Sequence, residues 1–262
     1  MTFQTLGLLS LFFLTAVLYS AVGFGGGSTY TALLVLTNED YILIPILSLS
    51  CNIIVVFGNV IFAIKKKLID LKTSFPLIAF SVPLSFIGGA IPISELFFVS
   101  FLAVVLFGAG VQMLRKPIVQ IDAILTKPTP KLNGIKAGAI GGVLGFIAGL
   151  VGIGGGIFLA PVLYALKWGH TRNIAAICSL FILVNSCAGL LGQLTKLGVF
   201  NLHVAFYENW VLIAAVFSGG IIGRNVSFTF LSETVIKRIT AGLILFVAIR
   251  LAFKVIQILN GV

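Results

Sequence analysis

Charged residues are scarce in this chain of 262 residues. They make up 9% of the sequence, with seven Asp or Glu against 17 Lys or Arg. A water-soluble domain of this size needs far more polar surface, whereas 59% of these residues are hydrophobic and the mean hydropathy is +1.19. The composition therefore predicts an all-α polytopic membrane protein that crosses the cell membrane several times and is surrounded by lipid.

Residues and motifs for catalytic or metal chemistry are scarce as well. The sequence has no H-E-x-x-H, G-x-S-x-G or Walker motif, and its three cysteines lie in apolar segments without C-x-x-C spacing. The two histidines lie in or beside loops, and the acidic residues fall in loops or at helix ends. We therefore expect neither an enzyme nor a metal or cofactor site. A coupling proton or Na⁺ is left open, because Na⁺ binds unwound carbonyls and a proton can travel on a substrate.

Glycine, in contrast, is abundant and concentrated in two matching motifs. Gly-Phe-Gly-Gly-Gly-Ser at 23–28 returns as Gly-Ile-Gly-Gly-Gly-Ile at 152–157. Each glycine costs a helix roughly 1 kcal/mol relative to alanine, so both motifs predict a break in an apolar helical run. Unwound backbone in a membrane is tolerated where it is buried in protein or lines a cavity, and paired breaks point to a transporter binding site. The alternative is that these glycines permit tight helix crossings.

The two motifs divide the chain into two halves. We predict one membrane domain over 1–262, with repeat 1 at 1–116, a cytoplasmic linker at 117–134 and repeat 2 at 135–262. The linker is the only polar stretch of any length. Each half is predicted to hold a glycine-broken first segment followed by three transmembrane helices of about 20 residues.

The distribution of Lys and Arg bears on the orientation of the repeats. If each broken segment is a full crossing, the repeats are parallel; if each is a re-entrant hairpin, they are inverted. The hairpin arrangement gathers most basic residues on one side, as the positive-inside rule requires. We therefore favour inverted repeats with both termini outside. The basic loops serve as orientation signals and lipid contacts, so nucleic acid is not an expected partner.

A broken helix exposes backbone N–H groups whose dipoles attract an anion. We expect the two breaks to face each other near the membrane midplane and to bind a small anionic substrate. The candidate substrate-binding residues are Gly25, Gly26, Gly27, Ser28, Thr29, Asn52, Gly154, Gly155, Gly156, Asn185, Gln193 and Arg224.

The polar candidates have competing interpretations. The buried amides Asn52 and Asn185, at near-equivalent positions, either bind the substrate or satisfy carbonyls freed by the breaks. Gln193 is a weaker candidate of the same kind. Arg224 lies in an apolar run, where a charge suggests function, but it is also within reach of the interface by snorkelling.

The two glycine motifs, Pro161 and the Gly-x-x-x-x-Gly-Arg stretch at 218–224 resemble the TauE/SafE sulfite exporter family over nearly the whole chain. The resemblance implies transport of small sulfur oxyanions or organosulfonates, such as sulfite, thiosulfate or sulfoacetate. Ala32 stands in the first half where the second has Pro161, so the two half-sites differ. We therefore expect a secondary transporter, an exporter. An anion channel and a membrane accessory subunit are the alternatives, and a homodimer is left open.

Overall fold

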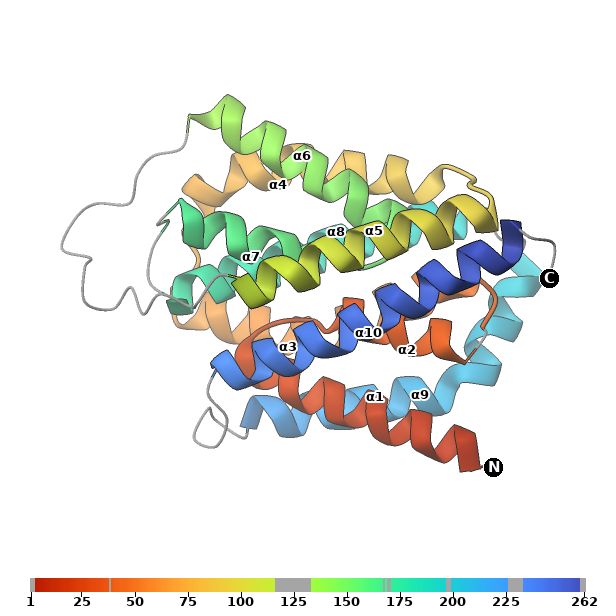
Figure 1. Cartoon of the computed structure of the whole chain (residues 1–262). Helices are drawn as coiled ribbons and strands as arrows, with labels where there is room; N and C mark the ends of the chain where they lie inside the picture. Colours follow the sequence, from red (N-terminus) through yellow and green to blue (C-terminus); the bar gives the residue numbers. More distant parts are fainter. Residues whose placement is uncertain are drawn as a thin grey trace.

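The computed structural model describes residues 3–37, 39–115, 133–166, 168, 171–196, 199–225 and 233–259. Every regular element in these ranges is a helix (Figure 1). The helices are α1 (Phe3–Val22), α2 (Gly27–Leu36), α3 (Leu43–Lys65), α4 (Leu71–Ala90), α5 (Glu95–Arg115), α6 (Gly134–Val151), α7 (Gly156–Ala165), α8 (Thr171–Leu194), α9 (Val199–Asn225) and α10 (Glu233–Leu259). The expected all-α fold is thus confirmed for the described residues. All but the last two residues of the predicted 117–134 linker lie outside them.

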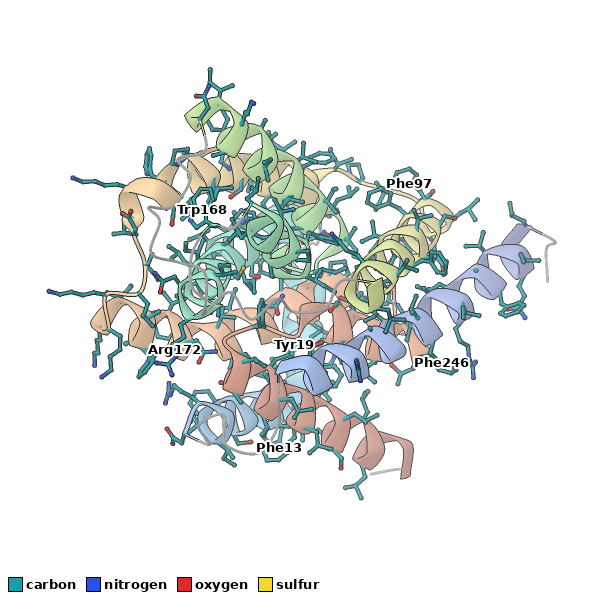
Figure 2. The ribbon with its side chains drawn as sticks, turned by 60° about the vertical axis from the view of Figure 1, so that its left-hand side comes forward. Phe13, Tyr19, Phe97, Trp168, Arg172 and Phe246 are labelled. Atoms are coloured by element: carbon teal, nitrogen blue, oxygen red, sulfur yellow. The ribbon has the colours of Figure 1, made fainter. Side chains whose placement is uncertain are left out.

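Several helices are suited to a membrane. Among the described residues, α3, α5, α6 and α8 are long and apolar enough to cross a bilayer, and parts of α1, α2 and α4 form shorter apolar helices. Large apolar side chains cover the outside of the bundle. Phe97 and Phe246, which are 50% and 51% exposed, point away from the helices (Figure 2). An apolar exterior of this kind is stable in lipid and not in water.

Glycines bring helices into backbone contact, as in the pairs α6 with α4 and α9 with α1. Along α6, a methyl group placed on Gly141, Gly145 or Gly149 would run into a carbonyl oxygen of α4. In the second pair, the same substitution at Gly219 of α9 would meet the carbonyl oxygen of Phe13 in α1 at 2.6 Å. Side chains larger than hydrogen would separate these helices, as in other small-residue membrane contacts. These glycines lie outside the two motifs and permit tight helix crossings.

The chain folds back at both glycine motifs. In the first half, the rings of Phe12 in α1 and Tyr30 in α2 lie 5.0 Å apart, although the two residues are 18 positions apart in the chain. A continuous helix would place them about 27 Å apart at 1.5 Å per residue. In the second half, Gly155 packs against Ala148 of α6. In Figure 1, α1 and α2 run in opposite directions. Each broken segment is therefore a pair of helical arms rather than one rod.

Helices α3 and α8 pack against each other. Each also packs on the short helix of its own half, α3 on α2 and α8 on α7. Both helices are heavily buried: 67% of the most apolar 18-residue stretch of α3 and 61% of that of α8 lie inside the protein. The buried positions include serine and asparagine side chains as well as apolar ones. This central pair holds the two breaks in place.

Candidate functional site

The backbone of each break adopts conformations that favour glycine. Gly23 and Gly26 in the first break have φ angles of 81° and 80°. Gly152, Gly154 and Gly155 in the second have φ angles of 77°, 80° and 81°. An L-residue pays roughly 1–2 kcal/mol in this left-handed region, which explains why the sequence has glycine there. These glycines therefore turn the chain, unlike the glycines that lie within the α6 helix.

Each break presents the start of a short helix. The first helical hydrogen bonds of α2 run from the N–H groups of Thr29 and Tyr30 to the Gly26 carbonyl. In α7, the corresponding bonds run to the Gly155 carbonyl. The N–H groups that precede these bonds have no partner within the helix, and the positive end of the helix dipole lies there. Both breaks thus offer donors suited to an anion.

The two breaks meet at the crossing of α3 and α8. A methyl group placed on Gly27 of the first break would lie 2.5 Å from the carbonyl oxygen of Ile153 in the second. Similar groups on Gly25 and Gly154 would both contact Asn52 of α3. They would also approach Ile182 of α8, at 3.1 and 3.2 Å. The structure therefore brings the predicted glycines together around one pair of side chains.

Asn52 links the two breaks. It is completely buried, and its Nδ2 donates to the Ile153 carbonyl at 3.0 Å. Its Oδ1 faces Gly25 and has no hydrogen-bond partner among the described residues. Ser186 of α8 is also fully buried, and its Oγ has no partner within the described chain. Asn52 thus satisfies a carbonyl of the break, as one of its two interpretations predicted, and still presents a free acceptor.

Hydroxyl groups hold the first break. Thr31 donates to Ser48 Oγ, and Ser48 donates in turn to the carbonyl of Gly27, both at 2.9 Å. The hydroxyl groups of Thr29 and Tyr19 lie 2.9 Å apart and share a hydrogen bond. The predicted site residues Ser28 and Thr29 are both 3% exposed. The start of α2 is therefore a polar, anchored segment.

Ser179 connects the first break to the other half of the chain. Its hydroxyl group donates to the carbonyl of Gly23, although the two residues are 156 positions apart. The second break makes the reverse contact, because Gly152 packs against the backbone of Pro45 in α3. Each break therefore rests on the central helix of the opposite half.

Gln193 satisfies carbonyls at the end of α6. Its Nε2 donates to Gly149 O at 2.8 Å and to Leu150 O at 3.4 Å. Asn59 of α3 does the same at the end of α1, where its Nδ2 donates to Ser20 O at 3.2 Å. The two amides therefore cap the two arms that lead into the breaks. This geometry matches Gln193 with Asn59.

Asn185 behaves differently from Asn52, although the sequence suggested near-equivalent positions. Its Nδ2 donates to the carbonyl of Phe181 in its own helix at 2.8 Å, and its Oδ1 has no partner within the described residues. Its backbone carbonyl accepts a hydrogen bond from Ser85 of α4. Neither of these hydrogen bonds is with a break, so its predicted role in binding stays a prediction.

Arg224 lies away from the meeting point of the breaks. Its guanidinium group packs against Gly58 of α3, and its side chain is exposed. Gly58 is six residues beyond Asn52, which corresponds to about 9 Å along the helix. In this conformation Arg224 does not contact the two breaks. Its predicted role as a positive charge that binds the substrate stays a prediction.

Sequence reasoning missed Ser186, Ile182 and the serines that hold the breaks. A helical signal for Ser179 and Ser186 was present, because the residues on each central helix that face the breaks recur every seven positions. These positions are 45, 52 and 59 in α3, and 179, 186 and 193 in α8. Seven residues are close to two helical turns, so each set occupies one face. Asn185 is one residue away from this face, but its amide is a larger polar group than the Ser186 hydroxyl and so gave the stronger sequence signal.

Comparisons with known proteins give the chain a family. The model of the family described as "Sulfite exporter TauE/SafE" matches residues 8–251. A probable membrane transporter protein of Sinorhizobium fredii is 30% identical over 249 residues, covering 95% of this chain and 98% of that protein. A probable membrane transporter protein of Haemophilus influenzae is 32% identical over 83 residues, covering 32% of this chain and 30% of that protein. No solved structure matches the chain.

These matches confirm the resemblance that the glycine motifs suggested. The family and its relatives are membrane transporters rather than enzymes, in agreement with the shortage of buried acid–base groups. The match covers both breaks and both central helices, and so includes the whole site described above. The chain belongs to the TauE/SafE sulfite exporter family of membrane transporters.

Proposed function

We propose that this chain is a secondary transporter of the cell membrane that exports a small sulfur-containing anion, such as sulfite, thiosulfate or an organosulfonate. Transport proceeds by alternating access around one site between the two breaks. The observation that carries the proposal is the convergence of two helix N-termini on Asn52, with Gly27 and Ile153 in contact. Two partially positive helix ends directed at one place favour an anion without a charged side chain. The name of the matching family supports sulfite or a related compound as the cargo.

We also propose that the two halves are inverted repeats with re-entrant hairpins. Helices α5 and α10 occupy matching places in the two halves, pack together and run in opposite directions (Figure 1). Equivalent helices of parallel repeats would run in the same direction. Helix α1 begins and α10 ends at one end of the molecule, whereas α5 ends and α6 begins at the other. This arrangement supports six crossings with both termini outside.

Helix contacts within and between the halves add to this proposal, because they come in matching pairs. Helix α4 packs on α6 as α9 packs on α1, and α2 packs on α3 as α7 packs on α8. The equivalent amides Asn59 and Gln193 cap the equivalent arms. Exchange of the two halves therefore preserves the packing, which is what a pseudo-two-fold axis in the membrane plane requires.

Counterflow in liposomes tests the transport proposal. Purified protein is reconstituted with unlabelled sulfite or sulfoacetate inside, and labelled substrate is added outside. A carrier transiently accumulates label against its gradient and saturates with concentration, whereas a channel only equilibrates it. No flux from the reconstituted chain would instead favour an accessory subunit and contradict the proposal.

Impermeant thiol labelling tests the hairpin topology. A single cysteine is introduced at Thr37, the exposed residue that follows α2, in a cysteine-free background. If α1 and α2 form a re-entrant hairpin, this cysteine reacts from outside the cell. Reaction only from the cytoplasmic side would overturn the inverted arrangement, because it would make the broken segment a full crossing. A cysteine at Lys66, after α3, is the matched control and reacts only from the cytoplasm.

A further inference from the structure

Asn52 Oδ1 is a buried hydrogen-bond acceptor that has no partner among the described residues. The hydrogen bond from Nδ2 to the Ile153 carbonyl fixes the amide orientation, since the flipped amide would set two oxygens against each other. Oδ1 is therefore directed toward Gly25, in a place with no exposure and no donor from the described chain. A buried acceptor without a partner is destabilising, so such a group in a native protein calls for an explanation, of which a bound ligand is one.

Ser186 supplies a second group of this kind beside the first. A methyl group placed on Gly154 would lie 2.7 Å from both Ser186 Oγ and Asn52 Nδ2, so these two side chains flank the same point of the second break. Ser186 has zero exposure, and its hydroxyl has no partner within the described residues. A hydroxyl both donates and accepts, whereas Oδ1 only accepts. The groups around the breaks therefore include donors for an anion and acceptors that an anion without hydrogens cannot satisfy.

The charge distribution distinguishes a cation from an anion that carries its own hydrogen. Free acceptor oxygens alone would suit Na⁺, but the two helix N-termini beside them disfavour a cation. A small monoanion with one O–H or N–H group satisfies both requirements. Its charged oxygens accept from the backbone N–H groups, and its hydrogen is donated to Asn52.

We propose that this site selects small monoanions that bear a hydrogen-bond donor, such as a singly protonated oxyanion, over equally sized anions with acceptors only. The inference rests on the proposed anion site. Asn52 Oδ1 receives the substrate's hydrogen, and Ser186 contributes a second polar contact. The same physics lets enzyme and transporter sites reject analogues that leave a buried group unpaired. For a sulfur oxyanion, the transported species is then hydrogensulfite rather than the sulfite dianion, and its proton crosses with it.

Two probes of the same shape and charge test this selection. Near pH 6, methylphosphonate is a monoanion with one P–OH group, whereas methanesulfonate is a monoanion with three acceptor oxygens and no donor. Their affinities are measured by isothermal titration of the full chain in detergent, with and without Na⁺. The variants are Asn52→Leu and Ser186→Ala, the second of which removes a hydroxyl that has no hydrogen-bond partner among the described residues. Ser50→Ala is the matched control, because the Ser50 hydroxyl donates to Ile46 O within its own helix and has no other hydrogen bond among the described residues.

We expect the wild type and Ser50→Ala to bind methylphosphonate about tenfold more tightly than methanesulfonate, as one satisfied buried acceptor predicts. Asn52→Leu brings the ratio close to one, and Ser186→Ala lowers it. Equal or tighter binding of methanesulfonate by the wild type overturns the inference while leaving the anion site intact. Binding of methanesulfonate that requires Na⁺ also overturns it, since the oxygen then holds a cation. If sulfite and both probes fail to bind, the proposed function fails, and the inference fails with it.

Discussion

The first and second breaks share a backbone design but differ in what surrounds them. Both turn the chain with left-handed glycines and lead into a helix of ten residues. The start of α2 is tied by hydroxyl groups, including the Ser48 bond to the Gly27 carbonyl. The start of α7 instead rests on apolar side chains, with Gly156 against Ile182 and Gly155 against Phe181. The two breaks thus share a backbone conformation, while the side chains around the starts of α2 and α7 differ.

This difference gives the two breaks different tasks in our account. The anchored first break, with Asn52 Oδ1 directed at it, is suited to the polar part of an anion. The apolar side chains at the start of α7, Phe181 and Ile182, suit a hydrophobic part of the substrate or a contact that moves. Apolar packing is non-directional, so α7 can shift without breaking a side-chain hydrogen bond of the Ser48 kind. Asymmetry of this sort lets one site bind an unsymmetrical substrate.

The largest expected effect follows from replacing a left-handed glycine in either break. Gly26→Leu and Gly155→Leu should each abolish transport, because the new residue must adopt a φ near +80° and displace Tyr19 or Phe181. Counterflow measures the loss of transport, and detection of each variant in the membrane fraction shows that it still inserts into the membrane. Gly108→Leu is the control, since a methyl group on Gly108 meets nothing within 4 Å. Normal flux in either break variant would show that its break is dispensable.

An intermediate effect distinguishes the two amide caps. Gln193 is 2% exposed and bonds two carbonyls, whereas Asn59 is half-buried and bonds one at 3.2 Å. We expect Gln193→Leu to lower the free energy of unfolding by about 1–3 kcal/mol and Asn59→Leu by about 1 kcal/mol or less. Thermal unfolding of both variants in the same detergent gives the comparison. A larger loss from Asn59→Leu would contradict the assignment of the tighter cap to the second half.

The smallest effect concerns the turns that follow the two central helices. Lys66 and Lys67 after α3 are exposed, whereas Lys196 after α8 is half-buried. Burial lowers the pKa of Lys196 from its usual 10.5 to about 8. The folded protein therefore releases this proton before the unfolded chain does, and stability rises slightly as pH increases from about 8 to 10.5. Partial exposure keeps the effect small.

Unfolding temperatures at pH 7.5 and 9.5 test this prediction. The rise between the two values in the wild type should be smaller in Lys196→Met, which has no proton to release. Lys66→Met serves as the control and should keep the wild-type rise. An equal rise in the wild type and Lys196→Met would show that other groups determine the pH dependence.

The sequence was sufficient to predict that the chain is an all-helical membrane protein and that its helices are broken at two places. Low charge and long apolar runs predicted the class, because lipid leaves few alternatives to the helix. Glycines at 23–27 and 152–156 predicted the breaks, since they are too costly in a helix to be there without a structural reason. The interpretation of Asn52 as a partner for a freed carbonyl was also confirmed by its bond to Ile153.

The partners of individual side chains were less predictable, because they depend on helical phase and tertiary packing. Asn185 is one position away from the face of α8 that contacts the breaks, and its amide turns to its own helix. Ile182 is apolar and carried no signal of function, yet it lies between the two breaks. Composition alone could not place Arg224 beside Gly58 rather than beside the two breaks.

The central claim is that both breaks form one anion site, and binding stoichiometry tests it most directly. Titration of the purified wild type with sulfite should give one anion per chain. Gly26→Leu and Gly155→Leu should each remove that single site completely. Two anions per chain in the wild type, or half of the binding retained in either variant, would show that the breaks act as separate sites and would contradict the account.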